Sequence, residues 1–147
     1  MKISTRVQYA TRALLDIALN QDSKPVQLKD IAERQQISLP YLEHITNRLA
    51  SAGITRSIRG PRGGVSLARP AENIKISEII RAIEGPLSLV KCLGNADECS
   101  RSGACGTQDI WSDVQKAIEN ILESATLKDL VERQKEKEKT PVTMYNI

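Results

Sequence analysis

Three cysteines, the only ones in this 147-residue chain, lie close together and mark a segment that could bind metal. Cys92, Cys99 and Cys105 follow the pattern C-x6-C-x5-C, and the glycines among them give the backbone freedom to wrap around a small inorganic core. Soft thiolate ligands at this density select an iron–sulfur cluster or zinc. The sequence therefore predicts a thiolate-ligated metal site, with three free structural thiols as the alternative.

Three thiols leave one position of a four-ligand site open. The same segment offers oxygen and amide donors for this fourth position, namely Asp97, Glu98, Gln108 and Asp109. Lys91 and Arg101 lie nearby, and their positive charge would lower thiol pKa values and offset the negative charge of a thiolate-ligated cluster. Zinc stays open as an alternative, because three sulfurs plus a carboxylate are tolerated in structural sites, although uncommon.

The charge of the chain is unevenly distributed. Residues 1–70 carry 11 Lys and Arg against 5 Asp and Glu, a net +6, whereas residues 71–147 carry 10 against 13, a net −3. A nucleic-acid surface is therefore expected in the first half. Aromatic residues make up only 3% of the chain and Phe is missing, which argues against a platform that stacks single-stranded bases.

Hydropathy and cysteine content indicate the cellular compartment of the protein. No stretch reaches the ~18 consecutive apolar residues that a membrane span requires. The chain also lacks a secretory signal, so reduced, metal-binding thiols fit the three cysteines better than a disulfide framework does. We therefore expect a cytoplasmic protein with no membrane partner.

The elements that must position a nucleic-acid surface lie in the basic half. Apolar residues at helical spacing predict helices over 5–19, 28–36 and 39–52. Thr5, with a Gln three residues later, is the expected capping box of the first helix, and Ser38 is the expected N-cap of the third. A tight turn between the second and third helices makes this pair a helix-turn-helix.

A basic hairpin follows the helix pair. Two short strands within 54–69 flank a glycine-rich turn, and a fourth helix follows, with Ser77 as its expected N-cap and Gly85-Pro86 as its end. This order is that of a winged helix-turn-helix, whose second helix enters the major groove of double-stranded DNA while the wing suits the minor groove. The expected DNA contacts are Ser38, Pro40, Tyr41, Glu43, His44, Asn47, Arg48, Arg59, Gly60, Arg62 and Gly63.

Several of these residues admit more than one role. Glu43 could accept a hydrogen bond from cytosine N4, and Asn47 or Arg48 could contact a base edge or a phosphate. Tyr41 could equally be a packing residue. Arg56 and Arg69 also lie in or beside the hairpin and add to its positive charge. A winged helix that binds only proteins is the alternative reading of the whole module.

The second half of the chain predicts a helix for self-association. Apolar residues step by 3, 4, 3 and 4 positions, an a/d pattern, through Trp111, Val114, Ile118, Ile121 and Ala125. We expect one long amphipathic helix that forms a homodimer, with packing back onto its own core as the alternative. The fold class is thus mainly α with a small β-hairpin wing, and the expected parts are a winged helix-turn-helix domain (1–85), a cluster-binding loop (86–108), a dimerisation helix (109–134) and a flexible tail (135–147).

Five stretches of the chain resemble one family of regulators. They are MKISTRVQYATRALLDIAL, DIAERQQISLPYLEHITNRLASAGI, IRGPRGGVSLARP, ISEIIRAIEG and the three-cysteine segment. Together they resemble the IscR/NsrR family of winged-helix regulators, most closely its iron–sulfur cluster regulator branch, over nearly the whole chain up to about Gln134. The resemblance implies homodimers that bind palindromic operators through recognition helix and wing, with a cluster held between the fourth helix and the dimer helix.

The chain departs from this family at the fourth cluster ligand. The family adds a histidine shortly after the third cysteine, or an aspartate near the N-terminus, whereas the matching positions here hold Thr107 or Gln108, and Gln8. The branch implies a [2Fe-2S] rather than a [4Fe-4S] cluster. The first cysteine spacing is also one residue longer than in the family's best-known cluster regulators.

The expected function is an iron–sulfur-cluster-sensing, DNA-binding regulator, most simply a repressor of cluster-biogenesis genes. A nitric-oxide- or redox-sensing repressor that uses the same cysteines is the alternative. An enzyme or an electron carrier is disfavoured, because the chain lacks a fourth cysteine, a catalytic His–carboxylate pair and a nucleotide-binding loop.

Overall fold

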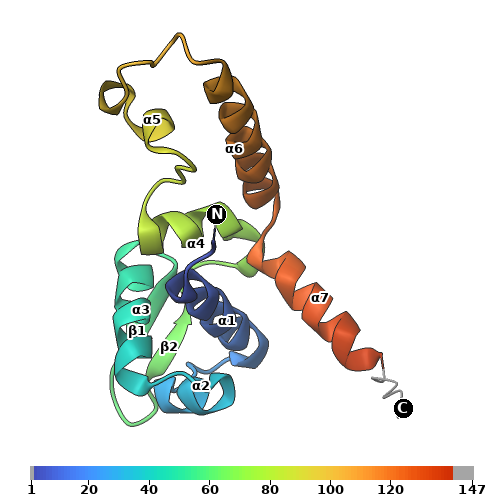
Figure 1. Ribbon diagram of the computed structural model, residues 1–147. Coiled ribbons are helices and arrows are strands. Elements are labelled where there is room, and N and C mark those ends of the chain that lie inside the picture. The colour runs from blue at the N-terminus through green and yellow to red at the C-terminus, as the bar shows by residue number, and fades with distance from the viewer. Residues whose placement is uncertain (1, 141–147) are drawn as a thin grey trace, which may run out of the picture.

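A computed structural model describes residues 2–140 as a mainly helical protein with one antiparallel β-hairpin, which confirms the predicted fold class (Figure 1). In chain order, the elements are α1 (Thr5–Asn20), α2 (Leu28–Gln35), α3 (Leu39–Ser51), β1 (Thr55–Ile58), β2 (Gly64–Leu67), the 3-10 turn η1 (Ala71–Asn73), α4 (Ile76–Glu84), α5 (Lys91–Gly94), the 3-10 turn η2 (Ala96–Glu98), α6 (Gly106–Ser124) and α7 (Leu127–Lys139).

One hydrophobic core unites α1 to α4, the hairpin and the start of α7. Leu14 and Ile17 of α1, Leu49 of α3 and Ile79 of α4 all belong to this core and are fully buried. Leu127, the first residue of α7, is fully buried in the same cluster. The predicted domain over 1–85 is therefore completed by the far end of the chain, which packs along α1.

The hairpin is fixed to the body at its second strand. Its register runs from the pair Thr55 and Leu67 to the pair Ile58 and Gly64. The Val26 amide donates to the Val65 carbonyl at 2.9 Å and the Val26 carbonyl accepts from the Val65 amide at 2.8 Å, so the loop before α2 extends this small sheet. The hairpin therefore has a fixed orientation relative to α2.

Two helix starts differ from the prediction. Ser4, and not Thr5, caps α1, and its hydroxyl oxygen accepts from the Val7 amide at 3.2 Å. The capping box expected at Thr5 is thus wrong, because the N-cap is Ser4 and the Gln8 side chain donates to the Ile3 carbonyl instead. The N-cap expected at Ser77 is wrong as well, because Lys75 occupies that position and its amide donates to the Glu78 carboxylate at 2.9 Å.

The single helix expected over 109–134 is wrong. Helix α6 begins at Gly106 and ends at Ser124, and the next two residues are extended. Thr126 then starts α7, because its hydroxyl accepts from the Asp129 amide while the Asp129 carboxylate accepts from the Thr126 amide. The predicted tail over 135–147 starts inside α7, and positions 141–147 lie outside the described residues.

Helix α6 leaves the body at an angle to α7 and stands away from the core beside α4 (Figure 1). The segment 86–105, with the short α5, leads outward from α4 to the start of α6, at the end of the molecule opposite to α2. Within residues 2–140, no helix has the length and hydropathy to cross a membrane.

Candidate nucleic-acid interface and cysteine segment

Helices α2 and α3 meet in the tight turn of a helix-turn-helix. Gln36 adopts a left-handed conformation with φ 54°, and the Ile37 amide donates to the Ala32 carbonyl at 3.0 Å. This turn ends α2 and lets Ser38 begin α3, as predicted, although the Ser38 side chain makes no capping hydrogen bond. Pro40 lies in the first turn of α3, where its missing amide costs nothing.

A buried carboxylate holds α2 against α1. Asp16 is 3% exposed and accepts from Arg34 Nε at 3.0 Å, from Arg34 Nη2 at 2.6 Å and from Gln35 Nε2 at 2.9 Å. The hydrogen bonds that Arg34 donates to Asp16 raise the pKa of Arg34 above its ordinary value. Sequence reasoning missed this cluster, because Asp16 and Arg34 are 18 residues apart and no local pattern links them.

Helix α3 divides into a buried and an exposed side. Leu42, Ile45 and Leu49 fill the core. Six of the predicted DNA contacts lie on the exposed side, namely Ser38, Pro40, Glu43, His44, Asn47 and Arg48. Apart from Leu39 in its first turn, the exposed side of α3 is thus polar.

Tyr41 packs inward and is half-buried. Its ring meets Tyr9 of α1 edge to face, with 5.8 Å between the ring centroids, and the Arg12 guanidinium lies 5.6 Å from the Tyr9 centroid. These contacts stabilise the junction of α1 and α3. The packing role that was left open for Tyr41 is therefore present in the fold.

Arg48 connects the exposed side of α3 to α4. Its Nη1 donates to the carbonyl of Ile83 at 2.6 Å, in the last turn of α4, where carbonyl groups lack helical partners. Arg48 therefore has a structural contact in addition to any contact with DNA.

The arginines of the hairpin divide into two kinds. Arg59 and Arg62 are exposed in the turn of the hairpin. Gly60 lies between them in the chain, and Gly63 follows Arg62. Arg56 Nε instead donates to the Ser66 hydroxyl at 3.1 Å. Arg59 and Arg62 are thus the wing arginines that the fold leaves free for a polyanion.

Arg69 belongs to an ion pair behind the hairpin. It donates to the Glu78 carboxylate at 3.1 and 3.3 Å and to the Asn73 carbonyl at 2.6 Å. Burial acts to raise the pKa of Glu78, but hydrogen bonds from the Lys75 amide and from Arg69 outweigh it and lower this pKa overall. The ion pair fastens the end of the wing to α4.

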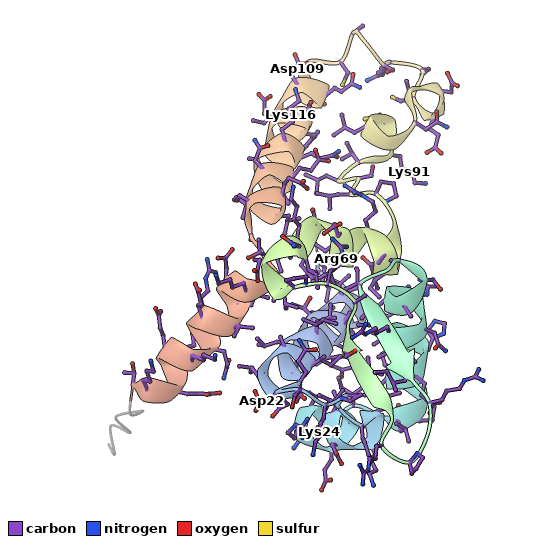
Figure 2. All side chains as sticks on the ribbon, turned by 180° about the vertical axis from the view of Figure 1, so that it is seen from behind. Asp22, Lys24, Arg69, Lys91, Asp109 and Lys116 are labelled. Carbon is purple, nitrogen blue, oxygen red and sulfur yellow. The ribbon has the colours of Figure 1, made fainter. Side chains whose placement is uncertain are left out.

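The three cysteines lie around α5 and at the start of α6, as free and half-exposed thiols. This segment is at the end of the molecule opposite to Lys24, as the positions of Lys91 and Asp109 show (Figure 2). Within residues 2–140, no three His, Cys, Asp or Glu side chains are grouped closely enough to hold one metal ion.

The four donors considered for the fourth ligand position differ in what they contact. Asp97, Glu98 and Asp109 are exposed. Gln108 is half-buried, and its side-chain oxygen accepts from the Gly103 amide at 3.2 Å, which closes the turn before Cys105.

Cys105 is the N-cap of α6, and its environment favours the thiolate. Its sulfur lies 3.1 Å from the Thr107 hydroxyl oxygen. That hydroxyl, the amides of Thr107 and Gln108 and the charge of Arg101 lower the pKa of Cys105. The expected effect of Arg101 is present, but hydrogen bonds at the helix start contribute more.

Helix α6 exposes an apolar face. Ile110 is 55% exposed, Trp111 45% and Ile121 67%, and the helix has no buried residue. Its main contacts with other helices are with α4 and α5, and Gln115 accepts from the Leu89 amide in the loop before α5. Of the expected a/d positions, Trp111 and Ile121 are therefore exposed. The others, Val114, Ile118 and Ala125, are half-buried.

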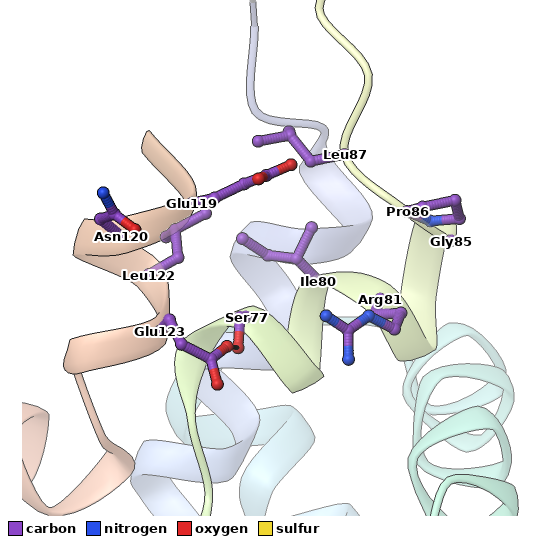
Figure 3. Close-up of a pocket in the computed structure, with 10 residues that line it drawn as sticks. All are labelled: Ser77, Ile80, Arg81, Gly85, Pro86, Leu87, Glu119, Asn120, Leu122 and Glu123. Carbon is purple, nitrogen blue, oxygen red and sulfur yellow. Dashed lines mark hydrogen bonds between the residues drawn. The ribbon is translucent and has the colours of Figure 1, made fainter. Parts of the chain in front are cut away.

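The base of α6 is joined to the start of α4 (Figure 3). The Glu123 carboxylate accepts from Lys75 Nζ at 2.5 Å and from the Ser77 hydroxyl at 2.6 Å, and these hydrogen bonds lower the pKa of Glu123. Beside them, the Ile76 amide donates to the Ala125 carbonyl at 2.9 Å. Sequence reasoning missed this joint, although the Thr126 capping box could have revealed the end of α6.

Known proteins with similar sequences and structures are transcription regulators. The HTH-type transcriptional regulator IscR of Vibrio atlanticus is 40% identical over 89% of this chain and 75% of its own length. IscR of Escherichia coli is 38% identical over 91% of this chain and 82% of its own. Both relatives are regulators and not enzymes.

Solved structures agree with the sequence relatives. T. potens IscR superposes with a TM-score of 0.79 at 37% identity, covering 99% of this chain and 96% of that one. CymR, the global cysteine regulator of B. subtilis, has a TM-score of 0.77 at 32% identity, covering 90% of this chain and 98% of its own.

The sequence pattern of the Rrf2 family, described as iron-dependent transcriptional regulators, matches residues 3–133. A match of this extent, together with the winged-helix neighbours, identifies a DNA-binding regulator. The chain belongs to the Rrf2 family of transcriptional regulators.

Proposed function

We propose that this protein is a repressor of iron–sulfur cluster biogenesis genes that binds a [2Fe-2S] cluster and changes its affinity for DNA with cluster occupancy. The observation that carries the proposal is the location of the three thiols. They occupy the one segment that connects α4, which packs against the recognition helix α3, with α6, which exposes an apolar face. Relatives named IscR support the same assignment.

Cys92, Cys99 and Cys105 would hold the cluster. Their donor chemistry fits, because all three are free, solvent-accessible thiols on one segment. Cluster binding would draw this segment together, because the three sulfurs are not grouped without it. The cluster would supply redox chemistry and sensitivity to oxygen and nitric oxide. Asp97, Glu98, Gln108 and Asp109 remain the proposed donors for the fourth position.

The exposed face of α6 would form a homodimer. Exposed Ile110, Trp111 and Ile121 are the type of side chains that self-association buries. In a twofold dimer, the two recognition helices would enter successive major grooves on one side of the DNA. This arrangement matches a palindromic operator with half-sites ~34 Å apart. Such a protein would act in the cytoplasm, where the DNA is.

Residues on α3 and the wing would read the operator. The exposed side of α3 supplies Glu43, His44 and Asn47 for base edges, and Arg59 and Arg62 supply positive charge for the minor groove and phosphates. Ordering of the cysteine segment against α6 would change the orientation of α6 at its joint with α4. The distance between the two recognition helices of the dimer would change with the orientation of α6.

A redox-sensing repressor that uses bare thiols is the second candidate. The favouring observation is Cys105, whose hydrogen bonds with Thr107 and the start of α6 lower its pKa and so favour the reactive thiolate. A structural relative, Staphylococcus aureus CymR, has an oxidised form. This candidate predicts a response to oxidants in protein that holds no iron.

Anaerobic reconstitution tests the main proposal. Iron and sulfide content, visible absorbance and Mössbauer spectra are measured on the wild type and on Asp97→Ala and Gln108→Ala variants. We expect two irons and two sulfides per chain, and an altered spectrum in the variant that lacks the fourth ligand. Ser100→Ala, at an exposed site beside Cys99, is the matched control. Protein that binds zinc but no iron–sulfur cluster would contradict the proposal.

A further inference from the structure

Large exposed apolar side chains outside α6 are few among the described residues, and two of them lie together. Leu39 is 39% exposed, Ile58 41% and Ile3 49%. Leu39 is the first residue of α3, and Ile58 is the last residue of β1. Both line one open groove between the recognition helix and the wing.

The other residues of this groove limit what could occupy it. Glu43 lines it one helical turn after Leu39, on the same face of α3, and Lys29 lines it at the start of α2. A carboxylate beside Leu39 repels a phosphate, so the sugar–phosphate backbone is a poor occupant of this part of the groove. Lys29 is the one positive charge in the lining, and the exposed wing arginines Arg59 and Arg62 do not line the groove.

The edges of base pairs offer a partner for both the apolar Leu39 and the carboxylate of Glu43. The major-groove edge of DNA carries amino groups, which a carboxylate can accept from, and one apolar group, the C5 methyl of thymine. An exposed leucine in the first turn of a recognition helix lies where such helices contact base edges. Leu39 could therefore contact the methyl group of a thymine while Glu43 accepts a hydrogen bond from an amino group on a neighbouring base edge.

We propose that Leu39, assisted by Ile58, reads the C5 methyl group of a thymine in each half-site of the operator. The inference rests on the proposed function, because it requires that the α3 surface enters the major groove. It adds a specificity-determining apolar contact to the polar contacts already assigned to α3.

Replacement of thymine by deoxyuracil tests the proposal, because this exchange removes only the methyl group. An operator is first selected from a pool of random duplexes with the full-length protein. Each thymine is then replaced in turn by deoxyuracil, symmetrically in both half-sites, and affinity is measured for the wild type, Leu39→Ala, Ile58→Ala and the matched control Leu39→Met.

We expect one position at which deoxyuracil weakens wild-type binding about fourfold for each methyl removed, the effect of one buried methyl group. Leu39→Ala should bind the thymine operator more weakly and lose nothing further at that position. Leu39→Met, which keeps an apolar side chain, should retain most of the discrimination, and Ile58→Ala should reduce it in part.

The outcomes separate this inference from the proposed function. Tight binding that is indifferent to deoxyuracil at every position, or an equal loss in the wild type and Leu39→Ala, overturns the thymine contact alone. Indifference to deoxyuracil is measured on the wild-type protein, so this outcome remains decisive even if a variant folds poorly. Failure to bind any duplex overturns both, and capture of a protein partner by the wild type that Leu39→Ala abolishes would assign the groove to that partner.

Discussion

The Glu123 carboxylate accepts a 2.6 Å hydrogen bond from the Ser77 hydroxyl, which fastens the last turn of α6 to the first turn of α4. At the other end of α4, the Ile83 carbonyl accepts from Arg48 of the recognition helix at 2.6 Å. Helix α4 is therefore hydrogen-bonded at one end to the helix that follows the cysteines and at the other to the helix proposed to read DNA.

Removal of the Glu123 side chain should weaken the effect of the cysteine segment on operator binding and leave the fold intact. In Glu123→Ala, α6 loses its bonds to Lys75 and Ser77 but keeps the backbone bonds at Ala125. We expect the difference in operator affinity between cluster-loaded and cluster-free protein to shrink several-fold, with little change in thermal unfolding. Fluorescence anisotropy measures the affinities, and Glu132→Ala, at an exposed site on α7, is the control. An unchanged affinity difference would refute this role of Glu123.

Loss of the Asp16 carboxylate should destabilise the helix-turn-helix. Asp16→Ala leaves donors of Arg34 and Gln35 without their partner, and we expect the free energy of unfolding to fall by about 2 kcal/mol. Arg34 is 42% exposed, so water can take over part of its solvation and keep the loss moderate. Urea unfolding measures the change. Asp22→Ala, at an exposed site, should stay within about 0.5 kcal/mol of the wild type, and an equal effect of both substitutions would disprove the prediction.

The ion pair of Glu78 with Arg69 should make stability depend on pH. The pKa of Glu78 is lowered in the folded protein from its ordinary value of 4.5. Its contribution is therefore complete above pH 4.5 and is lost as the pH falls through the lower folded-state pKa. Glu78→Gln should cost about 1 kcal/mol at neutral pH and progressively less in acid.

Urea midpoints of the wild type and Glu78→Gln, compared across the acid range, test this dependence. Glu72→Gln, at an exposed site on η1, serves as the control and should follow the wild type at each pH. A difference between the wild type and Glu78→Gln that grows toward acid pH would show the opposite linkage.

Cys105 should owe its thiolate character to Thr107. In Thr107→Val the hydroxyl that lies 3.1 Å from the sulfur is lost, so the pKa of Cys105 should rise toward its ordinary value. Alkylation of cluster-free protein by iodoacetamide, followed by mass spectrometry as a function of pH, should then require higher pH for the same rate at Cys105. Ser100→Ala should leave the profile unchanged, and an unshifted profile in Thr107→Val would argue against the hydroxyl.

The DNA-reading half of the fold could be predicted from local sequence. Helical spacing, the Gln36 turn, Pro40 in the first turn of α3 and the glycine-rich hairpin are all short-range signals, and the structure has each of them. What sequence reasoning missed depends on contacts between distant residues. Asp16 with Arg34, Ser77 with Glu123 and the burial of Leu127 in the core have no local pattern.

The second half shows why periodicity alone misleads. Apolar steps through Ile118, Ile121 and Ala125 suggested a continuous helix, but the capping box of Thr126 and Asp129 and the pairing with residues 74–76 stop α6 at Ser124. At the cysteine segment, residue types predict the donors, but within residues 2–140 no three of them are grouped closely enough for one metal ion.

We propose that the three cysteines control operator binding through a cluster. The most direct test of this proposal compares operator affinity, under strict anaerobiosis, for cluster-loaded wild type, cluster-free wild type and the triple variant Cys92→Ala, Cys99→Ala, Cys105→Ala. We predict that loaded and cluster-free protein differ at least tenfold and that the triple variant matches the cluster-free protein, with no response to iron and sulfide. Equal affinity for all three would show that neither the cysteines nor a cluster controls operator binding.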